Sequence, residues 1–189
     1  MELLNLDKRD GYIYDPAIKG LDANFFAQLA GTTTVASSKL RYNAATNASF
    51  LEHEFGRIVY SLTIPVKPTA GDSRRWGLYA PGASADMGAI YFDITGAVFT
   101  VVVIDSQGNS RSSTITWLDP TWTNTPIKFE IDWAPDRIQF WVNGGIVATF
   151  AQISTAGIPF IALPLYVKNG NADNMDLSYI CVKRAAGIV

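Results

Sequence analysis

After about residue 50, the chain is a succession of short segments of apolar or alternating residues, separated by turn residues. The pattern predicts strands at 57–64, 75–80, 89–95, 97–104, 112–117, 127–133, 137–143, 146–150, 160–167 and 175–184. Segment 97–104 is apolar on both faces, so we expect a central strand covered on both sides. No helical pattern alternates with the strands, which disfavours a parallel α/β sheet. The spacing is typical of an antiparallel sandwich or barrel.

Composition excludes several functional classes. Lys and Arg number 15 against 17 for Asp and Glu, and the formal charge is -2. Without a basic block, the chain has no electrostatic attraction for nucleic acid or an anionic membrane. We find no apolar stretch of the roughly 18 residues that a membrane span needs, and no signal peptide at the start. We therefore expect a protein made in a cytosol. The single cysteine, Cys181, is expected as a buried thiol on a strand.

The first 48 residues differ from the rest and are expected to form an irregular N-terminal arm, while 49–189 form the sandwich. Leu21, Phe25, Phe26 and Leu29 recur at helical spacing, which predicts one or two helical turns within 21–31. Such an arm packs either on its own domain or on a neighbouring chain. Phe25 and Phe26 are therefore candidate interface residues.

Residues 127–148 have the pattern of a β-hairpin pair. Phe129, Ile131 and Trp133 share one face of the first strand, and 134–136 form a tight turn around a proline. Asn143, followed by a glycine, suits the positive φ angles of a type I′ turn. The two predicted strands therefore pair in antiparallel fashion and turn their apolar faces to a common core.

This hairpin resembles the concanavalin A-like superfamily of legume lectins, laminin G-type modules and laminarinase-type β-glucanases. The residues that match the pattern I-x-W-x-P-x-x-I-x-F-x-V-[DN]-G are Ile131, Trp133, Pro135, Ile138, Phe140, Val142, Asn143 and Gly144. Pro164 and the strands after it resemble the closing strands of the same fold. The resemblance implies an all-β fold, an antiparallel two-sheet jelly-roll β-sandwich, and says little about function.

Glucanases of this superfamily would need carboxylates at alternate strand positions, spaced E-x-D-x-E, to work across one glycosidic bond. Glu130 and Asp132 have this spacing, but the third position is Ala134. Glu52 and Glu54 have it too, with Gly56 in third place. His53 is the only histidine, and we interpret it as structural or solvated. We therefore predict no catalytic residues and a protein that is not an enzyme.

The sequence contains no metal motif, so we predict no cofactor and no metal site. Some superfamily members bind calcium through Asp and Asn side chains. The candidates by residue type are Asp86, Asp93, Asp105, Asn109, Asn171, Asp173 and Asn174. The run 171–174 is the best of these, and its simplest interpretation is a turn before the last strand.

Carbohydrate binding would need solvent-facing aromatic rings beside amide or carboxylate groups. If Ile138 and Phe140 face the core, Gln139 and Trp141 face away from it. Trp141 then stacks on a sugar, lies in an interface or is covered by the N-terminal arm. Trp122 and Tyr79 are further candidate sugar-binding residues.

The leading hypothesis from these observations is a non-catalytic structural protein. A lectin-like sandwich with an arm and no secretion signal is similar to bacteriophage virion proteins, such as capsid decoration or tail-associated proteins. The expected partners are other virion proteins or further copies of the chain in a homo-oligomer, and the expected location is the virion. The alternative is a carbohydrate-binding module that recognises glycans, and a polysaccharide-cleaving enzyme is the third hypothesis.

Overall fold

The computed structural model describes residues 11–53, 55–65, 69–79, 88–105, 107–116, 125–151 and 162–183. Its strands are β1 (Gly11–Tyr14), β2 (Phe26–Ala36), β3 (Lys39–His53), β4 (Gly56–Thr63), β5 (Ser73–Tyr79), β6 (Ala89–Thr95), β7 (Val98–Ile104), β8 (Ser110–Thr114), β9 (Ile127–Trp133), β10 (Arg137–Val142), β11 (Gly145–Ala151), β12 (Leu163–Asn169) and β13 (Met175–Lys183). One short helix, α1 (Pro16–Lys19), follows β1. Within the described ranges, no helix has the length and apolar character that crossing a bilayer requires.

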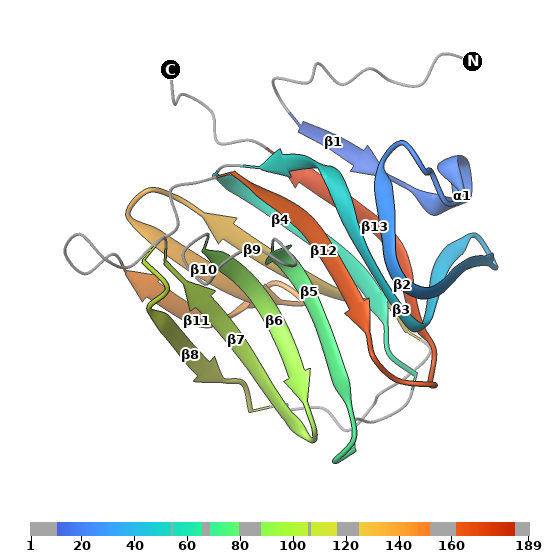
Figure 1. Cartoon of the computed structure of the whole chain (residues 1–189). Coiled ribbons are helices and arrows are strands. Elements are labelled where there is room, and N and C mark those ends of the chain that lie inside the picture. Colours follow the sequence, from blue (N-terminus) through green and yellow to red (C-terminus); the bar gives the residue numbers. More distant parts are fainter. Residues whose placement is uncertain are drawn as a thin grey trace.

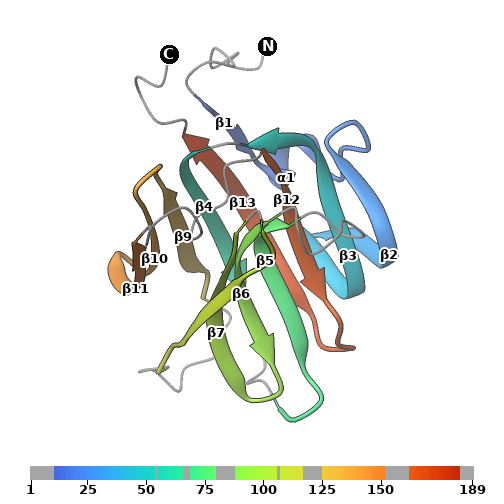
Figure 2. The ribbon, with the colours of Figure 1, turned by 60° about the vertical axis from the view of Figure 1, so that its left-hand side comes forward.

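The strands form an antiparallel sandwich of two layers (Figure 1). The first layer has the order β11-β10-β9-β4-β13, with β1 on the outer edge of β13. The second layer has the order β3-β12-β5-β6-β7-β8, with β2 beside β3. The long strand β3 belongs to both, because one end pairs with β13 and the other with β12. Figure 2 shows the two layers packed face to face.

Aromatic side chains from both layers make the core. Trp76 and Phe92 of the second layer contact Phe129 of the first, with ring centroids 4.7 Å and 5.3 Å apart. Phe92 also meets Phe140 edge to face at 5.1 Å. All of these side chains are fully buried. Burial of such large rings supplies much of the driving force for a sandwich.

Most of the strands predicted after residue 50 are present, with ends shifted by a few residues. The fold class, an all-β antiparallel jelly-roll sandwich, is confirmed. The expectation that segment 97–104 is covered on both sides is wrong. Phe99, Val101 and Val103 face the core, but Val98 is 53% exposed. β7 lies next to the edge strand β8, and the face of β7 that is turned away from the core forms part of the outer surface of the second layer.

The predicted hairpin forms as expected. Ile138 lies opposite Trp133, and Phe140 lies opposite Ile131, with all four side chains fully buried. Asn143 has φ 49° and the following glycine has φ 83°, as a type I′ turn requires. The hairpin therefore fixes which side chains of β9 and β10 face outward.

The N-terminal region is more regular than expected. Of the one or two helical turns predicted within 21–31, a single turn forms, in which Asp22 O accepts from Phe25 N and Phe26 N at 2.9 Å. A second turn does not form, since Phe26–Ala36 is a strand that pairs with β3. The apolar side chains of this segment form an aromatic cluster instead. The Phe25 ring stacks on the Tyr14 ring with centroids 4.6 Å apart, and the Phe26 ring meets Tyr14 edge-on with centroids 5.1 Å apart. Residues 11–48 thus dock on their own sandwich. The division at residue 48 stays a prediction, although β3 runs across it.

Candidate functional site

The outer face of the second layer carries a cluster that we call the tyrosine face: Arg75, Tyr79, Tyr91, Asp93 and Tyr166. Strand register brings these residues together, because Arg75 lies opposite Asp93 in the β5–β6 pair. Gly77 lies between Tyr91 on β6 and Tyr166 on β12. Core residues alternate with them along each strand, so these side chains point away from the core.

An ion pair holds the centre of the tyrosine face. Arg75 Nε donates to Asp93 Oδ1 at 2.9 Å, and Thr95 Oγ1 donates to Asp93 Oδ2 at 2.7 Å. The Arg75 guanidinium lies 4.1 Å from the Tyr91 ring centroid, which is cation–π geometry. Asp93 is therefore fixed as an acceptor, with 13% of its side chain exposed.

Three aromatic rings surround this pair. The Tyr79 ring meets Tyr91 at 5.7 Å and Tyr166 at 5.0 Å, both edge to face. Tyr91 and Tyr166 are buried, whereas Tyr79 is half-buried. Gly77 has φ 147° and places no side chain between the rings. A Cβ at this position would lie 2.4 Å from the carbonyl oxygen of Ile90. The cluster therefore depends on a glycine at this position.

Burial also sets the protonation of the buried phenols. Desolvation raises the pKa of Tyr91 above 10.0, although the nearby Arg75 partly opposes this. Desolvation raises the pKa of Tyr166 in the same way, with Arg75 and a hydrogen bond to Thr46 opposing it. Both phenols thus keep their protons at neutral pH and remain hydrogen-bond donors.

Alternate positions of β6 on the tyrosine face are Ala89, Tyr91 and Asp93, with a single carboxylate among them. The E-x-D-x-E triplet that the sequence analysis sought is absent from the described strands. Glu130 and Asp132 do share a face of β9, but on the other layer. Glu130 is engaged there by Arg57, whose Nε donates to Oε2 at 2.8 Å.

The structure separates the predicted sugar-binding residues. Tyr79 lies on the tyrosine face, whereas Gln139 and Trp141 lie on the outside of the first layer, across the core. Trp141 is half-buried, and the Arg57 guanidinium lies 5.8 Å from its ring centroid. Trp122 lies outside the described residues. The four residues therefore do not form one platform, and their sugar-binding role stays a prediction.

The candidate interface residues contact their own chain. Phe26 is 3% exposed, and Phe25 packs against the core and against Tyr12 at 5.5 Å. The register places Trp141, on β10, four strands away from β1, so β1 does not cover it. His53 is buried and hydrogen-bonds through Nε2 to the Tyr12 hydroxyl at 2.8 Å, which supports the structural interpretation.

Four residues of the tyrosine face are not among the site residues that the sequence predicts: Arg75, Tyr91, Asp93 (a calcium candidate only) and Tyr166. The sequence of 89–95 alternates through Ile90, Phe92 and Ile94, which implies that Tyr91 and Asp93 point away from the core. The pairing of β6 with β5, and of β5 with β12, was not predictable from any one segment.

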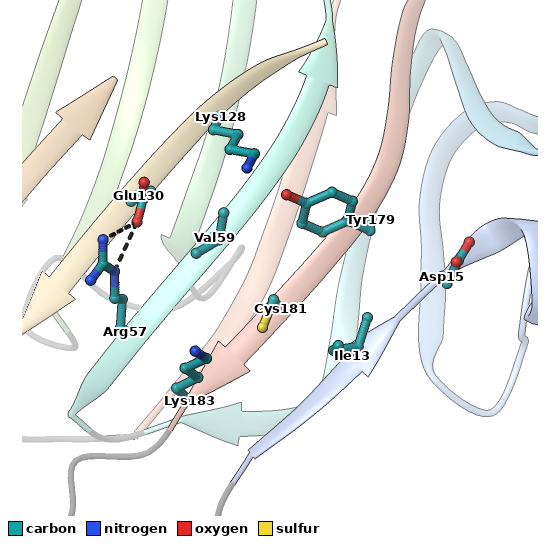
Figure 3. Close-up of a pocket in the computed structure, with 9 residues that line it drawn as sticks. All are labelled: Ile13, Asp15, Arg57, Val59, Lys128, Glu130, Tyr179, Cys181 and Lys183. Carbon is teal, nitrogen blue, oxygen red and sulfur yellow. Dashed lines mark hydrogen bonds and ion pairs between the residues drawn. The ribbon is translucent and has the colours of Figure 1, made fainter. Parts of the chain in front are cut away.

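The outside of the first layer has a pocket of about 610 Å³, which we call the outer pocket (Figure 3). Its lining residues are Ile13, Asp15, Arg57, Val59, Lys128, Glu130, Tyr179, Cys181 and Lys183. They come from β1, β4, β9 and β13 and from the residue after β1. Cys181 is half-buried, and burial raises the pKa of its thiol.

The calcium candidates are engaged with protein groups. Asp105 Oδ1 accepts from Gln107 N at 2.8 Å and from Asn109 N at 2.9 Å, which makes a closed turn. Asn171 Oδ1 accepts from Ser73 N at 2.9 Å. No group of three His, Cys, Asp or Glu suited to a metal occurs among the described residues. Asp86 lies outside them. The simplest interpretation of 171–174, a turn before the last strand, fits these contacts, because β13 begins at Met175.

Several proteins share this architecture or part of this sequence. No known family profile matches the chain. Xyloglucan endotransglucosylase protein 7 of Diospyros kaki is 29% identical over 133 residues, covering 65% of this chain and 48% of that protein. This chain thus spans about half the length of that relative.

Several solved structures have a fold similar to that of this chain over most of its length. The apo Crh5 transglycosylase superposes with a TM-score of 0.74 at 15% identity, covering 93% of this chain and 85% of that chain. The β-glucanase of Bacillus licheniformis gives 0.71 at 12% identity, with 93% and 99% covered. The laminarinase catalytic domain of Thermotoga maritima gives 0.70 at 14% identity, with 94% and 100% covered.

These findings correct the functional expectation. The prediction of a non-catalytic structural protein, and of a protein that is not an enzyme, is contradicted, because the similar proteins are named as transglucosylases, transglycosylases and glucanases. They give no support to a virion or capsid decoration protein. The error came from treating a missing E-x-D-x-E triplet as the absence of enzyme function. The chain has the jelly-roll fold that glucanases and transglycosylases share.

Proposed function

We propose that this chain is a polysaccharide-modifying enzyme that cleaves or transfers β-glucan chains at the tyrosine face. Two lines of similarity support the proposal: the jelly-roll fold of glucanases and transglycosylases, and a sequence relative named as a xyloglucan endotransglucosylase. The observation within the chain that carries the proposal is Asp93. It is a carboxylate held by Arg75 and Thr95 on an outer sheet face beside three tyrosine rings.

Three groups on this face, Asp93, Tyr79 and Arg75, have roles in that chemistry. In hydrolysis or transfer, the bond between the anomeric carbon and the leaving oxygen breaks, and the leaving oxygen takes up a proton from a water molecule, which regains one from the attacking water or hydroxyl. The anomeric carbon then bonds to water or to a hydroxyl of a second chain, which loses a proton. Asp93 supplies the negative charge that stabilises the oxocarbenium-like transition state. The half-buried ring of Tyr79 stacks on a sugar, and Arg75 positions Asp93.

The test measures both reactions at once. The full chain is incubated with xyloglucan, mixed-linkage β-glucan and laminarin, together with a fluorescent oligosaccharide acceptor. New reducing ends report hydrolysis, and an increase in the size of labelled products reports transfer. We expect Asp93→Asn to lower the rate by about 100-fold or more, the usual scale for loss of an essential carboxyl group.

The matched control is Asp132→Asn, which makes the same chemical change on the first layer. It should leave the rate within about twofold of wild type, as expected for a surface group outside the site. A wild-type chain that produces no new reducing ends and no labelled product on all three polysaccharides contradicts the proposal. Equal rates for Asp93→Asn and wild type contradict the assignment of Asp93.

A further inference from the structure

We propose that the outer pocket binds an amphipathic organic anion, a small molecule with a carboxylate or sulfonate group on an apolar body. The pocket lies on the first layer, across the core from the tyrosine face, so this site is independent of the proposed glycan chemistry. Its volume of about 610 Å³ falls in the range of roughly 300–1,000 Å³ that is usual for small-molecule sites.

The floor of the pocket is set by strand register. Ile13, Cys181 and Val59 occupy one row across β1, β13 and β4. Glu130 and Trp141 continue that row on β9 and β10. Ile13 is 57% exposed, although it is a large apolar side chain. With the half-buried ring of Tyr179, this row offers apolar surface that a bound molecule would remove from water.

Most of the charge in the pocket is already compensated. Arg57 donates from Nε and from a terminal nitrogen to Glu130 Oε2, and its guanidinium also lies over the Trp141 ring. Asp15 caps helix α1, because its Oδ1 accepts from Ala17 N at 2.8 Å. These carboxylates are therefore committed to partners within the chain.

Two cations remain. None of the ion pairs found between described residues includes Lys128 or Lys183. Both side chains are exposed at the rim of the pocket, and Figure 3 shows Lys128 extending toward Tyr179. The chain carries a net charge of -2, so a local excess of positive charge at one pocket selects for an anion.

The spacing of the two lysines indicates an elongated site. Lys128 lies opposite Ser61, which in turn lies opposite Tyr179 on β13. Lys183 is four residues further along β13, about 14 Å at the usual rise of a strand. An acid group bound at one end therefore leaves the apolar body lying over Val59 and Cys181.

The test uses 8-anilinonaphthalene-1-sulfonate as the probe and Cys181 as the reporter. Cys181 is the only cysteine in the chain, so alkylation by neutral iodoacetamide reads out this pocket alone. We expect saturable probe binding by fluorescence. A probe concentration of ten times its Kd should slow alkylation about tenfold, as mass action requires when the bound probe covers the thiol. Unchanged alkylation with bound probe overturns the proposal, as does the absence of saturable binding.

The anionic component is tested separately, on the wild-type chain. N-Phenyl-1-naphthylamine has the same aromatic body without the sulfonate, and it should bind at least about tenfold more weakly, equivalent to roughly 1.4 kcal/mol. Added salt should weaken binding of the sulfonate because its charge is screened. Equal affinity for both probes overturns the assignment of an anion.

A double variant locates the charge. Lys128→Met/Lys183→Met keeps the apolar stems and should weaken sulfonate binding by about tenfold or more, a loss of roughly 1.4 kcal/mol. The control Lys39→Met/Lys168→Met changes the net charge equally, but outside the pocket lining, and should stay within twofold. Equal effects of the two double variants overturn the proposal. If the first variant does not fold, the two-probe comparison on the wild-type chain decides the question.

Discussion

The tyrosine face and the outer pocket lie on opposite outer faces of one sandwich. Each contains an arginine–carboxylate ion pair whose guanidinium lies over an aromatic ring. On the tyrosine face, Arg75 holds Asp93 and lies 4.1 Å from the Tyr91 centroid. In the outer pocket, Arg57 holds Glu130 and lies 5.8 Å from the Trp141 centroid. The Arg75 side chain is 27% exposed and that of Arg57 is 47% exposed.

The difference lies in what surrounds each pair. On the tyrosine face, rings from β5, β6 and β12 close around the ion pair, which holds the carboxylate in place as the proposed function requires. In the outer pocket, the pair forms one wall of a space that is also lined by Ile13, Val59 and Cys181. The same local motif thus lies among packed aromatic rings in one place and borders a cavity in the other.

Trp76→Ala should have the largest effect, since it removes the support that both faces share. Trp76 is fully buried and contacts Phe92 of its own layer and Phe129 of the opposite layer. Loss of such a side chain costs about 3–5 kcal/mol in the free energy of unfolding. Guanidinium unfolding measures it. Trp141→Ala, at a half-buried outer position, should cost clearly less, and equal losses would contradict the two-layer description of the core.

Replacing each arginine by methionine should separate the two ion pairs. Arg75→Met leaves the buried Asp93 carboxylate without its cation, at a cost of about 1–3 kcal/mol in unfolding free energy. Arg57→Met also leaves a buried carboxylate without its cation, since the Glu130 side chain is 10% exposed. The Arg57 side chain is 47% exposed, however, so water can replace the guanidinium, and the cost should be smaller, about 1 kcal/mol. Urea unfolding of both variants measures the difference, and a larger loss for Arg57→Met would reverse the comparison.

A smaller effect should appear at alkaline pH. Burial raises the pKa of Tyr91 in the folded chain above the ordinary value of 10.0. The stabilisation linked to this tyrosine is therefore fully present below pH 10, where both states keep the proton. It is lost as the pH rises above 10, because the unfolded chain ionises first.

Comparison of wild type with Tyr91→Phe measures this dependence. The wild-type chain should lose unfolding free energy between pH 9 and pH 11, and Tyr91→Phe should lose less over the same interval. Burial also raises the pKa values of other groups, which supply the remaining dependence in both proteins: Tyr14, Tyr42, Tyr60, Tyr166 and Cys181. An equal or steeper dependence in Tyr91→Phe would contradict the burial of that phenol.

The sequence was informative wherever the signal was local. The alternation of 127–133, the proline turn and the positive-φ turn at Asn143 all belong to contiguous residues, and each has the predicted geometry. Aromatic spacing in 21–31 was partly misleading, because Phe25 and Phe26 serve contacts with Tyr14 that lie outside any local helix. The periodicity of residues 21–31 alone does not reveal these contacts with Tyr14.

The candidate site shows what could not be predicted from local sequence patterns. Asp93 and Tyr91 come from β6, Arg75 from β5 and Tyr166 from β12, and no spacing rule links these segments. Only the register of β5 with β6 makes Asp93 a partner of Arg75. Conversely, Gln139 and Trp141 were correctly expected to face away from the core, yet sandwich topology places them on the layer opposite to Tyr79.

Amide hydrogen–deuterium exchange of Asp93→Asn with and without xyloglucan oligosaccharide tests the central claim directly. The Asn variant allows the sugar to bind without being consumed. We predict slower exchange in β5, β6 and β12 (Ser73–Tyr79, Ala89–Thr95 and Leu163–Asn169), with no change in β9 and β10. Protection confined to β9 and β10, around Trp141, would place the glycan on the opposite face and contradict the account.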